Sequence, residues 1–283
     1  MALLTFLFSV KVAFCSCRPE VRHSGFQRSR SEYRIERTGR LPRFVNESSG
    51  LVFLPRPDGS GTFLTHNDSG GQPTLYEIRP DGTFVDSLRL PGTTNVDWEA
   101  LTLRDTSTVF LGDIGNNANI RQELSIYRVN RRRPQQAEIL RFRYVDQQAF
   151  PPPKDTRNFD SEALFQAGDS LFLLTKNRSR RPVRLYGMPV RPGQYALTPL
   201  DSIFLKSMVT DAALSPDGKR LAVLTYGKIF LFDLTSGAPL LSQPRECIRL
   251  PRGQTEGISF VNNTDLAMTN ERGRLFLIIR KKY

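Results

Sequence analysis

The chain has 283 residues, of which 39% are hydrophobic and 24% charged, a composition that excludes a disordered chain and is sufficient for a large core. Its net charge of +12 favours anionic partners such as lipid headgroups. Because no aromatic-interleaved motif accompanies the Arg clusters, nucleic acid is not expected as a partner. Two His and three Cys exclude His-rich metal sites and argue against a Cys-based zinc site or a disulfide framework.

The N-terminus begins with an apolar run, Met1–Ala13, that is too short to span a bilayer and is typical of a secretory signal. The following Ser16-Cys17 resembles a bacterial lipoprotein signal, although Lys11 and Cys15 fit that pattern less well. We therefore expect a signal in residues 1–17, a lipid on Cys17 and a basic tether at residues 18–32. The expected location is the periplasm or the outer membrane of a bacterium. An ordinary cleaved signal or a misassigned start codon is the alternative.

The rest of the chain repeats a short phrase, in which a polar and a small residue precede a Leu or Ile that opens an apolar strand. The phrase ends at Leu51, Leu101, Leu164, Leu214 and Ile258, which are 50, 63, 50 and 44 residues apart. Three further strands follow most of these positions, and turns such as Pro57-Asp58-Gly59 separate them. Four strands at this period predict a β-propeller.

The predicted fold is all-β, a single monomeric propeller over residues 33–283 with five four-stranded blades. A blade number of six is the alternative, because the second interval is long. The last unit lacks a fourth strand, and we expect Tyr33–Thr38 to supply it and close the ring.

Polar residues begin each innermost strand and follow each second strand, so they should converge on one mouth of a central channel. Carboxylates gathered there could bind Ca²⁺ or another divalent cation, which prefers oxygen ligands. The candidate metal ligands are Glu47, Glu99, Asp113, Glu162 and Asp211. The alternative is that Glu99, Glu162 and Glu256 accept hydrogen bonds from backbone amides of neighbouring blades.

The same mouth contains candidates for binding an unidentified ligand and for proton transfer. The ligand candidates are Asn67, Asp68, Asn116, Asn117, Lys176, Tyr226 and Glu271. His66, with Asp68 nearby, and Glu256 are the candidate general bases.

Four motifs occur in order: NESSGL at 46–51, HNDSGG at 66–71, DWEAL at 97–101 and GDIGNN at 112–117. With them the chain resembles a group of uncharacterised exported bacterial propeller proteins, which implies a propeller outside the cytoplasm but no activity. More distantly it is similar to gluconolactonase- and regucalcin-like calcium propellers, with Glu47 and Asp211 at their acidic positions. Ser49 and Glu162 stand where that group has Asn, which weakens the implication of calcium and of lactone hydrolysis.

Three functions follow as hypotheses. The favoured one is an exported, membrane-anchored binding module that holds a ligand or an envelope partner at the polar mouth. The second is a metal-dependent hydrolase of a lactone or phosphate ester. The third is a structural envelope protein whose basic surface contacts anionic lipid.

Overall fold

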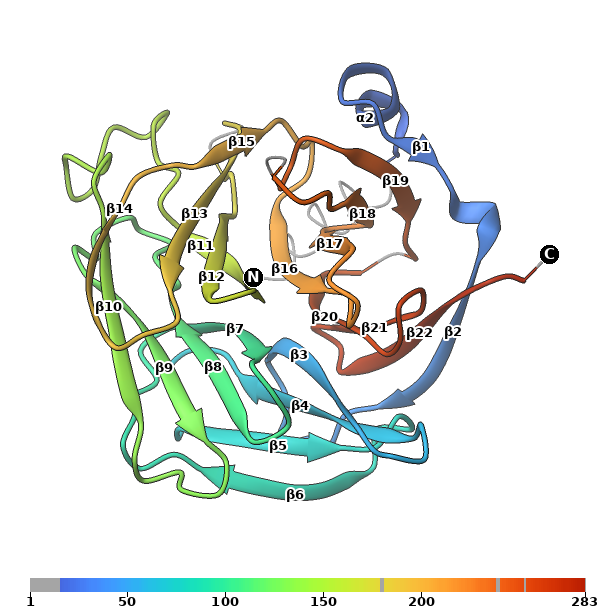
Figure 1. Cartoon of the computed structure of the whole chain (residues 1–283), viewed down its shortest axis with the longest axis horizontal. Helices are drawn as coiled ribbons and strands as arrows, with labels where there is room; N and C mark the ends of the chain where they lie inside the picture. Colours follow the sequence, from blue (N-terminus) through green and yellow to red (C-terminus); the bar gives the residue numbers. More distant parts are fainter. Residues whose placement is uncertain (1–15, 179–180, 238–239, 252, 283) are drawn as a thin grey trace.

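The computed structural model describes residues 16–178, 181–237, 240–251 and 253–282, and these form a ring of five antiparallel blades (Figure 1). The first blade contains β3 (Ser48–Pro55), β4 (Gly61–Asn67), β5 (Thr74–Ile78) and β6 (Phe84–Arg89). The second contains β7 (Trp98–Leu103), β8 (Thr108–Asp113), β9 (Leu124–Asn130) and β10 (Glu138–Tyr144). The third contains β11 (Ser161–Ala167), β12 (Ser170–Thr175), β13 (Val183–Pro189) and β15 (Asp201–Ile203).

The fourth blade contains β16 (Val209–Leu214), β17 (Arg220–Thr225), β18 (Lys228–Asp233) and β19 (Pro244–Arg249). The fifth contains β20 (Thr255–Phe260), β21 (Leu266–Asn270) and β22 (Arg274–Arg280). Its fourth strand is β2 (Tyr33–Arg40), which pairs antiparallel with β22 from Tyr33–Arg280 to Arg40–Arg274. The predicted propeller and its closure by an N-terminal strand are therefore confirmed, with five blades.

The long second interval, which left six blades open, does not contain an additional blade. Residues 145–160 form a connection between β10 and β11 without a strand. A further strand, β14 (Gly193–Leu197), leaves the third blade and pairs parallel with β10 as a fifth strand of the second blade.

Apolar side chains pack between neighbouring blades, because both faces of each sheet lie against another sheet. Trp98, for example, is fully buried in a cluster that joins Leu64 of the first blade to Val109 and Tyr127 of the second. This packing fixes each innermost strand beside the next around the ring axis, which brings their first residues together.

The segment expected to be a basic tether is instead packed on the fourth blade. It contains α2 (Arg18–His23), β1 (Gln27–Arg28) and a 3₁₀ turn at Arg30–Glu32. Cys17 is joined to Cys247 by a disulfide with a Cα–Cα distance of 5.9 Å, although 230 residues separate them. A sequence with three cysteines gives no sign of this pair, because only the docking of residues 16–32 beside β19 brings the two sulfurs together.

The disulfide also bears on the predicted lipid attachment at Cys17. A lipid thioether and a disulfide both use Sγ of Cys17, so the two cannot coexist, and the structure has the disulfide. The apolar run of the predicted signal and Cys15 lie outside the described residues. Within the described part of the chain, no helix has the length and apolar character needed to cross a membrane.

Candidate metal site at the acidic end of the ring axis

One backbone hydrogen bond recurs in all five blades at the end of the ring where the innermost strands begin. In each blade, an N–H just after the second strand donates to a carbonyl just before the first. The pairs are Asp68–Glu47, Gly115–Asp97, Lys176–Asp160, Tyr226–Met208 and Glu271–Gln254, at 2.7–3.2 Å. The structure therefore makes Asp68, Gly115, Lys176, Tyr226 and Glu271 equivalent positions around the axis.

A β-bulge near the start of each innermost strand is the second repeated feature. The bulged residues are Gly50, Glu99, Glu162, Thr210, and Glu256 with Gly257. Bulges redirect side chains and are common beside functional sites. Three glutamates therefore occupy equivalent bulges around one end of the axis, which we call the acidic end.

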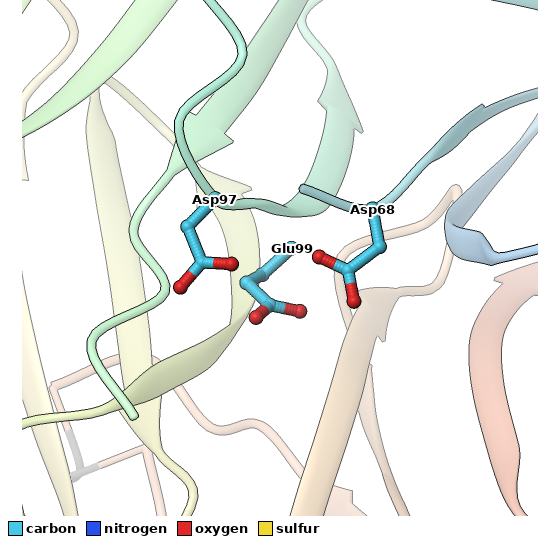
Figure 2. Close-up of side chains that lie close together, drawn as sticks. All are labelled: Asp68, Asp97 and Glu99. Atoms are coloured by element: carbon cyan, nitrogen blue, oxygen red, sulfur yellow. The ribbon is translucent and has the colours of Figure 1, made fainter. Parts of the chain in front are cut away.

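Asp68, Asp97 and Glu99 bring carboxylate oxygens within 4.8 Å of one another at the acidic end (Figure 2). Asp68 follows β4 of the first blade, whereas Asp97 and Glu99 flank the start of β7 in the second. Glu99 is buried and the two aspartates are partly buried. Carboxylate oxygens in such a group are suitable ligands for a hard divalent cation.

Gly115 keeps the space beside this cluster open. A Cβ on Gly115 would lie 2.2 Å from Oδ2 of Asp97 and 2.7 Å from Oε1 of Glu99, both far below van der Waals contact. Its carbonyl accepts a 2.8 Å hydrogen bond from Nη1 of Arg121. The glycine thus allows the backbone of the GDIGNN loop to approach both carboxylates closely.

Neighbouring polar groups hold the two strand ends in register. Nδ2 of Asn95 donates to the carbonyl of Asp68 at 2.7 Å, and its Oδ1 accepts from the backbone N–H of Trp98. Oδ1 of Asp113 accepts from the backbone N–H of Asp97 at 3.0 Å and lies 3.0 Å from Nη1 of Arg121. These contacts fix the backbone from which the cluster projects.

The electrostatics of the cluster favour a bound cation. Burial raises the pKa of Asp97 to about 6, with further contributions from Asp68 and Asp160. Burial and the neighbouring charge of Glu162 raise the pKa of Glu99 well above its usual value, and burial also raises that of Asp68. None of the ion pairs between described residues includes these three carboxylates, and the charges of Lys176 and Arg121 oppose their raised pKa values without reversing them, so a cation there would offset the remaining repulsion.

The third blade has internal countercharges at the acidic end. Lys176 forms a buried ion pair with Glu162, and its Nζ lies 5.6 Å from the ring centre of Tyr226. Burial disfavours the ammonium form, but Glu162, Tyr226 and Glu99 together outweigh it and raise the pKa of Lys176. Arg178 pairs with Asp160 and reaches Glu162 at 3.4 Å. The third and fourth blades therefore contribute paired charges and an aromatic ring to the acidic end.

The predicted metal ligands separate into two groups. Glu99 joins the cluster, while the exposed Glu47 lies close enough to Asp68 to contribute to its raised pKa. Three others have protein partners instead: Asp113 pairs with Arg121 and Glu162 with Lys176, while the carboxylate of Asp211 accepts hydrogen bonds from the backbone N–H groups of Ala212 and Ile258. The alternative reading, amide contacts between blades, thus describes Asp211 rather than the glutamates named for it.

The two candidate bases differ in accessibility. His66 is fully buried, its ring stands edge-on to Trp98 at 5.7 Å, and Nδ1 contacts the carbonyl of Asn67 at 3.0 Å. Burial lowers its pKa to about 4, which favours the neutral ring, and the same burial keeps the ring out of reach of a ligand in solution. Glu256 is partly buried, and burial raises its pKa well above the usual value despite the neighbouring Lys176.

The predicted ligand residues also divide. Asp68, Lys176, Tyr226 and Glu271 occupy equivalent positions at the acidic end. Asn67 and Asn116 instead support loops: Asn67 donates to the carbonyl of Phe44, and Asn116 contacts Phe159 and Arg121. Asn117 is exposed.

Asp97 and Gly115, both central to the cluster, were not among the residues predicted from the sequence to bind a metal or a ligand. Asp97 lies two residues before Glu99 in DWEAL, and Gly115 lies within GDIGNN, so both signals were present in the motifs. The sequence predicted that these two loops converge on one mouth, but it did not indicate that Asp97 and Glu99 cluster with Asp68 beside Gly115.

No protein-family model matches the sequence, and no curated protein matches it. Among solved structures, a gluconolactonase from Xanthomonas campestris is similar at 16% identity, over 89% of this chain and 81% of the other, with a TM-score of 0.47. The PQQ-bound aldose sugar dehydrogenase from Streptomyces coelicolor is similar at 11% identity, over 87% and 98%, with a TM-score of 0.49.

The WD40 repeats of RRP9 are similar at 10% identity, over 83% of this chain and 67% of the other, with a TM-score of 0.45. A gluconolactonase, to which the sequence bears a distant resemblance, is thus among these structures. Likeness at this level concerns the fold alone, so no activity or site residue is carried over to this chain.

Proposed function

We propose that the protein is a ligand-binding propeller whose site lies at the acidic end and includes a divalent cation held by Asp68, Asp97 and Glu99. The observation that carries this proposal is the meeting of these three carboxylates within 4.8 Å, without an ion-pair partner among the described residues. Ca²⁺ takes six to eight oxygen ligands. Three carboxylates leave coordination positions that water or an oxygen-bearing ligand would fill.

Thermal unfolding of the full chain tests the cation, first in EDTA and then with Ca²⁺, Mg²⁺ or Mn²⁺. At a concentration 100 times its Kd, a cation should stabilise the fold by about 2.7 kcal/mol. Glu99→Gln and Asp97→Asn should abolish the gain, whereas Glu138→Gln, which removes an exposed carboxylate from β10, should retain it. An equal gain in all four proteins, or none in the unmodified chain, would reject the site.

A second candidate function is metal-dependent hydrolysis of a lactone or phosphate ester. Glu256 supports it, because this carboxyl occupies a bulge at the acidic end and burial raises its pKa well above the usual value, which favours a proton-carrying form. The two functions differ in turnover. Recovery of the ligand in chemically unmodified form after incubation supports the binding module. Formation of a product that is lost in Glu256→Gln and retained in Glu138→Gln supports the enzyme.

Export remains part of the proposal and is supported by two independent features. The first is the apolar run at Met1–Ala13, and the second is the Cys17–Cys247 disulfide, a bond typical of oxidising compartments. Fractionation of cells that produce the full chain tests it: recovery of the protein only from the cytoplasm would reject export.

A further inference from the structure

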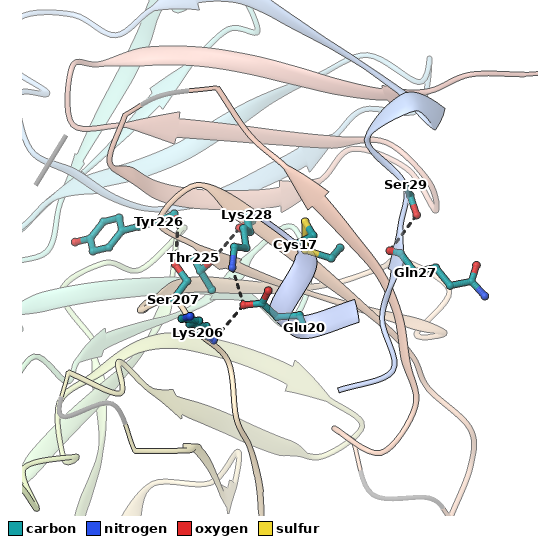
Figure 3. Close-up of a disulfide and its surroundings, with 10 residues drawn as sticks. Cys17, Glu20, Gln27, Ser29, Lys206, Ser207, Thr225, Tyr226 and Lys228 are labelled. Carbon is teal, nitrogen blue, oxygen red and sulfur yellow. Dashed lines mark hydrogen bonds and ion pairs between the residues drawn. A yellow bond between two sulfur atoms is a disulfide. The ribbon is translucent and has the colours of Figure 1, made fainter. Parts of the chain in front are cut away.

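Residues 17–33, which we call the N-terminal strap, run along the outer edge of the fourth blade and lead into the ring-closing strand β2 (Figure 1). Within the strap, β1 pairs parallel with β19, matching Gln27 to Glu246 and Arg28 to Cys247. The strap thus gives the outermost strand of this blade an additional partner, and its N-terminal end is bonded to the same strand through Cys17 (Figure 3).

An aromatic contact holds the middle of the strap. Phe26 is 1% exposed, and its ring centre lies 4.9 Å from that of Phe230 and 5.2 Å from that of Phe232. Both partners belong to β18, so the strap covers apolar surface of the fourth blade that would otherwise contact water.

A buried ion pair holds the helix of the strap. Nζ of Lys228 lies 2.6 Å from Oε1 of Glu20, and both side chains are 1% exposed. The same oxygen accepts a hydrogen bond from the backbone N–H of Lys206 at 3.2 Å (Figure 3). Removing either charge alone would leave its partner buried without compensation, so the pair is suited to a strap that stays docked.

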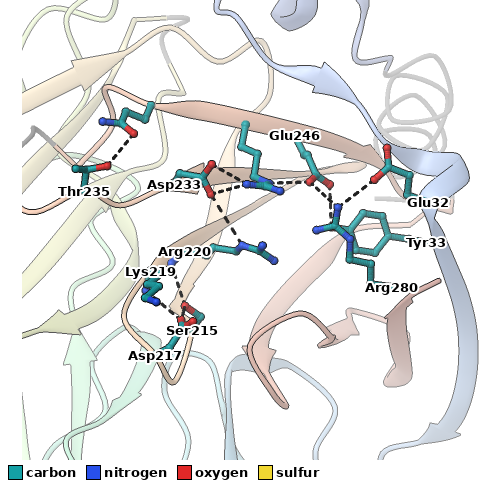
Figure 4. A network of polar contacts seen from close by, with 12 residues as sticks. Glu32, Tyr33, Ser215, Asp217, Lys219, Arg220, Asp233, Thr235, Glu246 and Arg280 are labelled. Carbon is teal, nitrogen blue, oxygen red and sulfur yellow. Dashed lines mark hydrogen bonds and ion pairs between the residues drawn. The ribbon is translucent and has the colours of Figure 1, made fainter. Parts of the chain in front are cut away.

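The C-terminal end of the strap connects the fourth and fifth blades. The hydroxyl of Tyr33 donates to Oε2 of Glu246 at 2.8 Å, and Arg280 of β22 lies 3.5 Å from Oε1 of Glu246 and 3.3 Å from Glu32 (Figure 4). Glu246 therefore joins β19 to both strands at which the ring closes.

We infer that the Cys17–Cys247 disulfide stabilises ring closure through the strap, so that the ring opens more readily when the disulfide is reduced. The ring is closed by pairing between strands near the two ends of the chain, and β2 can separate from β22 beginning at its N-terminal end. The disulfide fixes the chain upstream of that end to the neighbouring blade. With the disulfide intact, β2 can separate from β22 only as part of a short stretch of chain whose two ends are both fixed, at Cys17 on the fourth blade and at β3 in the first.

The disulfide stabilises the ring only in surroundings that keep the two cysteines oxidised. Its formation joins the sulfurs of Cys17 and Cys247 with loss of two protons and two electrons, and the electrons reduce a disulfide donor such as an oxidised dithiol oxidoreductase. A dithiol reductant reverses the exchange and is itself oxidised. The inference does not depend on the proposed cation site, which lies at the ring axis.

Peptide mapping of the full chain under non-reducing conditions tests the bond. We expect a Cys17 peptide linked to a Cys247 peptide, with the same link in Cys15→Ser. A free Cys17 thiol, a lipid thioether on Cys17, or a Cys15–Cys247 link would overturn the inference.

Hydrogen exchange with and without a phosphine reductant tests the consequence. Reduction should increase exchange of the β2 and β22 amides about tenfold or more and lower Tm by about 5–15 °C, while β8 and β9 should be unaffected. The double variant Cys17→Ser, Cys247→Ser should exchange as the reduced protein does and should not respond to the reductant. Unchanged exchange in β2 on reduction, or equal acceleration in all blades, would overturn the inference.

Discussion

At the scale of single residues, the second blade lacks a side chain at the position that follows the second strand. Gly115 occupies the position at which the other blades place Asp68, Lys176, Tyr226 and Glu271. The missing side chain is what lets two carboxylates lie against the backbone of this loop. The residue that shapes the cluster thus contributes no functional group to it.

Gly115→Ala should therefore weaken cation binding about tenfold or more, because the new Cβ would displace Asp97 and Glu99. Isothermal titration calorimetry measures the change. Gly71→Ala is the matched control, since a Cβ there would come no closer than 4.0 Å to Nδ2 of Asn95. Equal affinity in the two variants would contradict the role given to Gly115.

At the scale of elements, Asp211 connects the innermost strands of two blades. It lies on β16, is fully buried, and accepts a 2.8 Å hydrogen bond from the backbone N–H of Ile258 on β20. Burial raises its pKa well above the usual value, although the backbone hydrogen bonds oppose the shift. Its function is contact between blades.

Asp211→Ala should destabilise the fold by about 1–3 kcal/mol, because the buried N–H groups of Ala212 and Ile258 would lose their acceptor. Asp211→Asn keeps an acceptor and should cost less. Urea unfolding measures both, with Asp86→Ala on β6 as an exposed control. Equal stability of the alanine and control variants would refute this role.

Glu246 gives the junction of the fourth and fifth blades a pH dependence. Burial opposes its ionisation, but hydrogen bonds from Arg245 and Tyr33 and the charge of Arg280 outweigh this and lower its pKa below 4.5. Since the folded pKa lies below the unfolded one, the stabilisation is fully present above pH 4.5 and is lost as pH falls through the folded pKa.

The Tm difference between the unmodified protein and Glu246→Gln should accordingly be largest near pH 6–7 and shrink as the pH falls below 4.5. Thermal scans from pH 7 to pH 3 measure it. A difference that is constant over this range, or that grows on acidification, would be inconsistent with an ionised Glu246.

At the scale of the whole molecule, the repeat in the sequence was sufficient to predict the propeller, since each blade contains its own strand and turn pattern. Even the closing strand followed from the missing fourth strand of the last unit. The site was predicted only in part. Glu99 and Asp68 were named, but the role of Asp97 and the use of Asp113 and Glu162 as ion-pair partners depend on contacts between loops that no local pattern encodes.

The Cys17–Cys247 pair and the docked strap were not predicted for the same reason. Phe26 and Glu20 are isolated apolar and acidic residues in a basic segment, and their partners on β18 lie about 200 residues away. Only the closed ring places these residues next to one another.

Removal of residues 1–40 deletes β2 and should abolish cooperative unfolding, because β22 would become an unpaired edge with Ile278 exposed. A chain that begins at Ser16 retains the strap and β2 and should unfold cooperatively. Circular dichroism melts and size-exclusion chromatography distinguish the two. If the chain without residues 1–40 were monomeric and unfolded cooperatively, ring closure by β2 would be dispensable.

The recurring backbone hydrogen bond has a geometric consequence for recognition. A backbone that repeats five times around an axis would, with identical side chains, offer a bound molecule five indistinguishable poses. Here the side chains differ in every blade, with carboxylates beside the first two and a lysine with an aromatic ring beside the third and fourth. A molecule with unlike ends would therefore bind in a single orientation, and the polarity of the rim would decide which of its ends lies over Asp97.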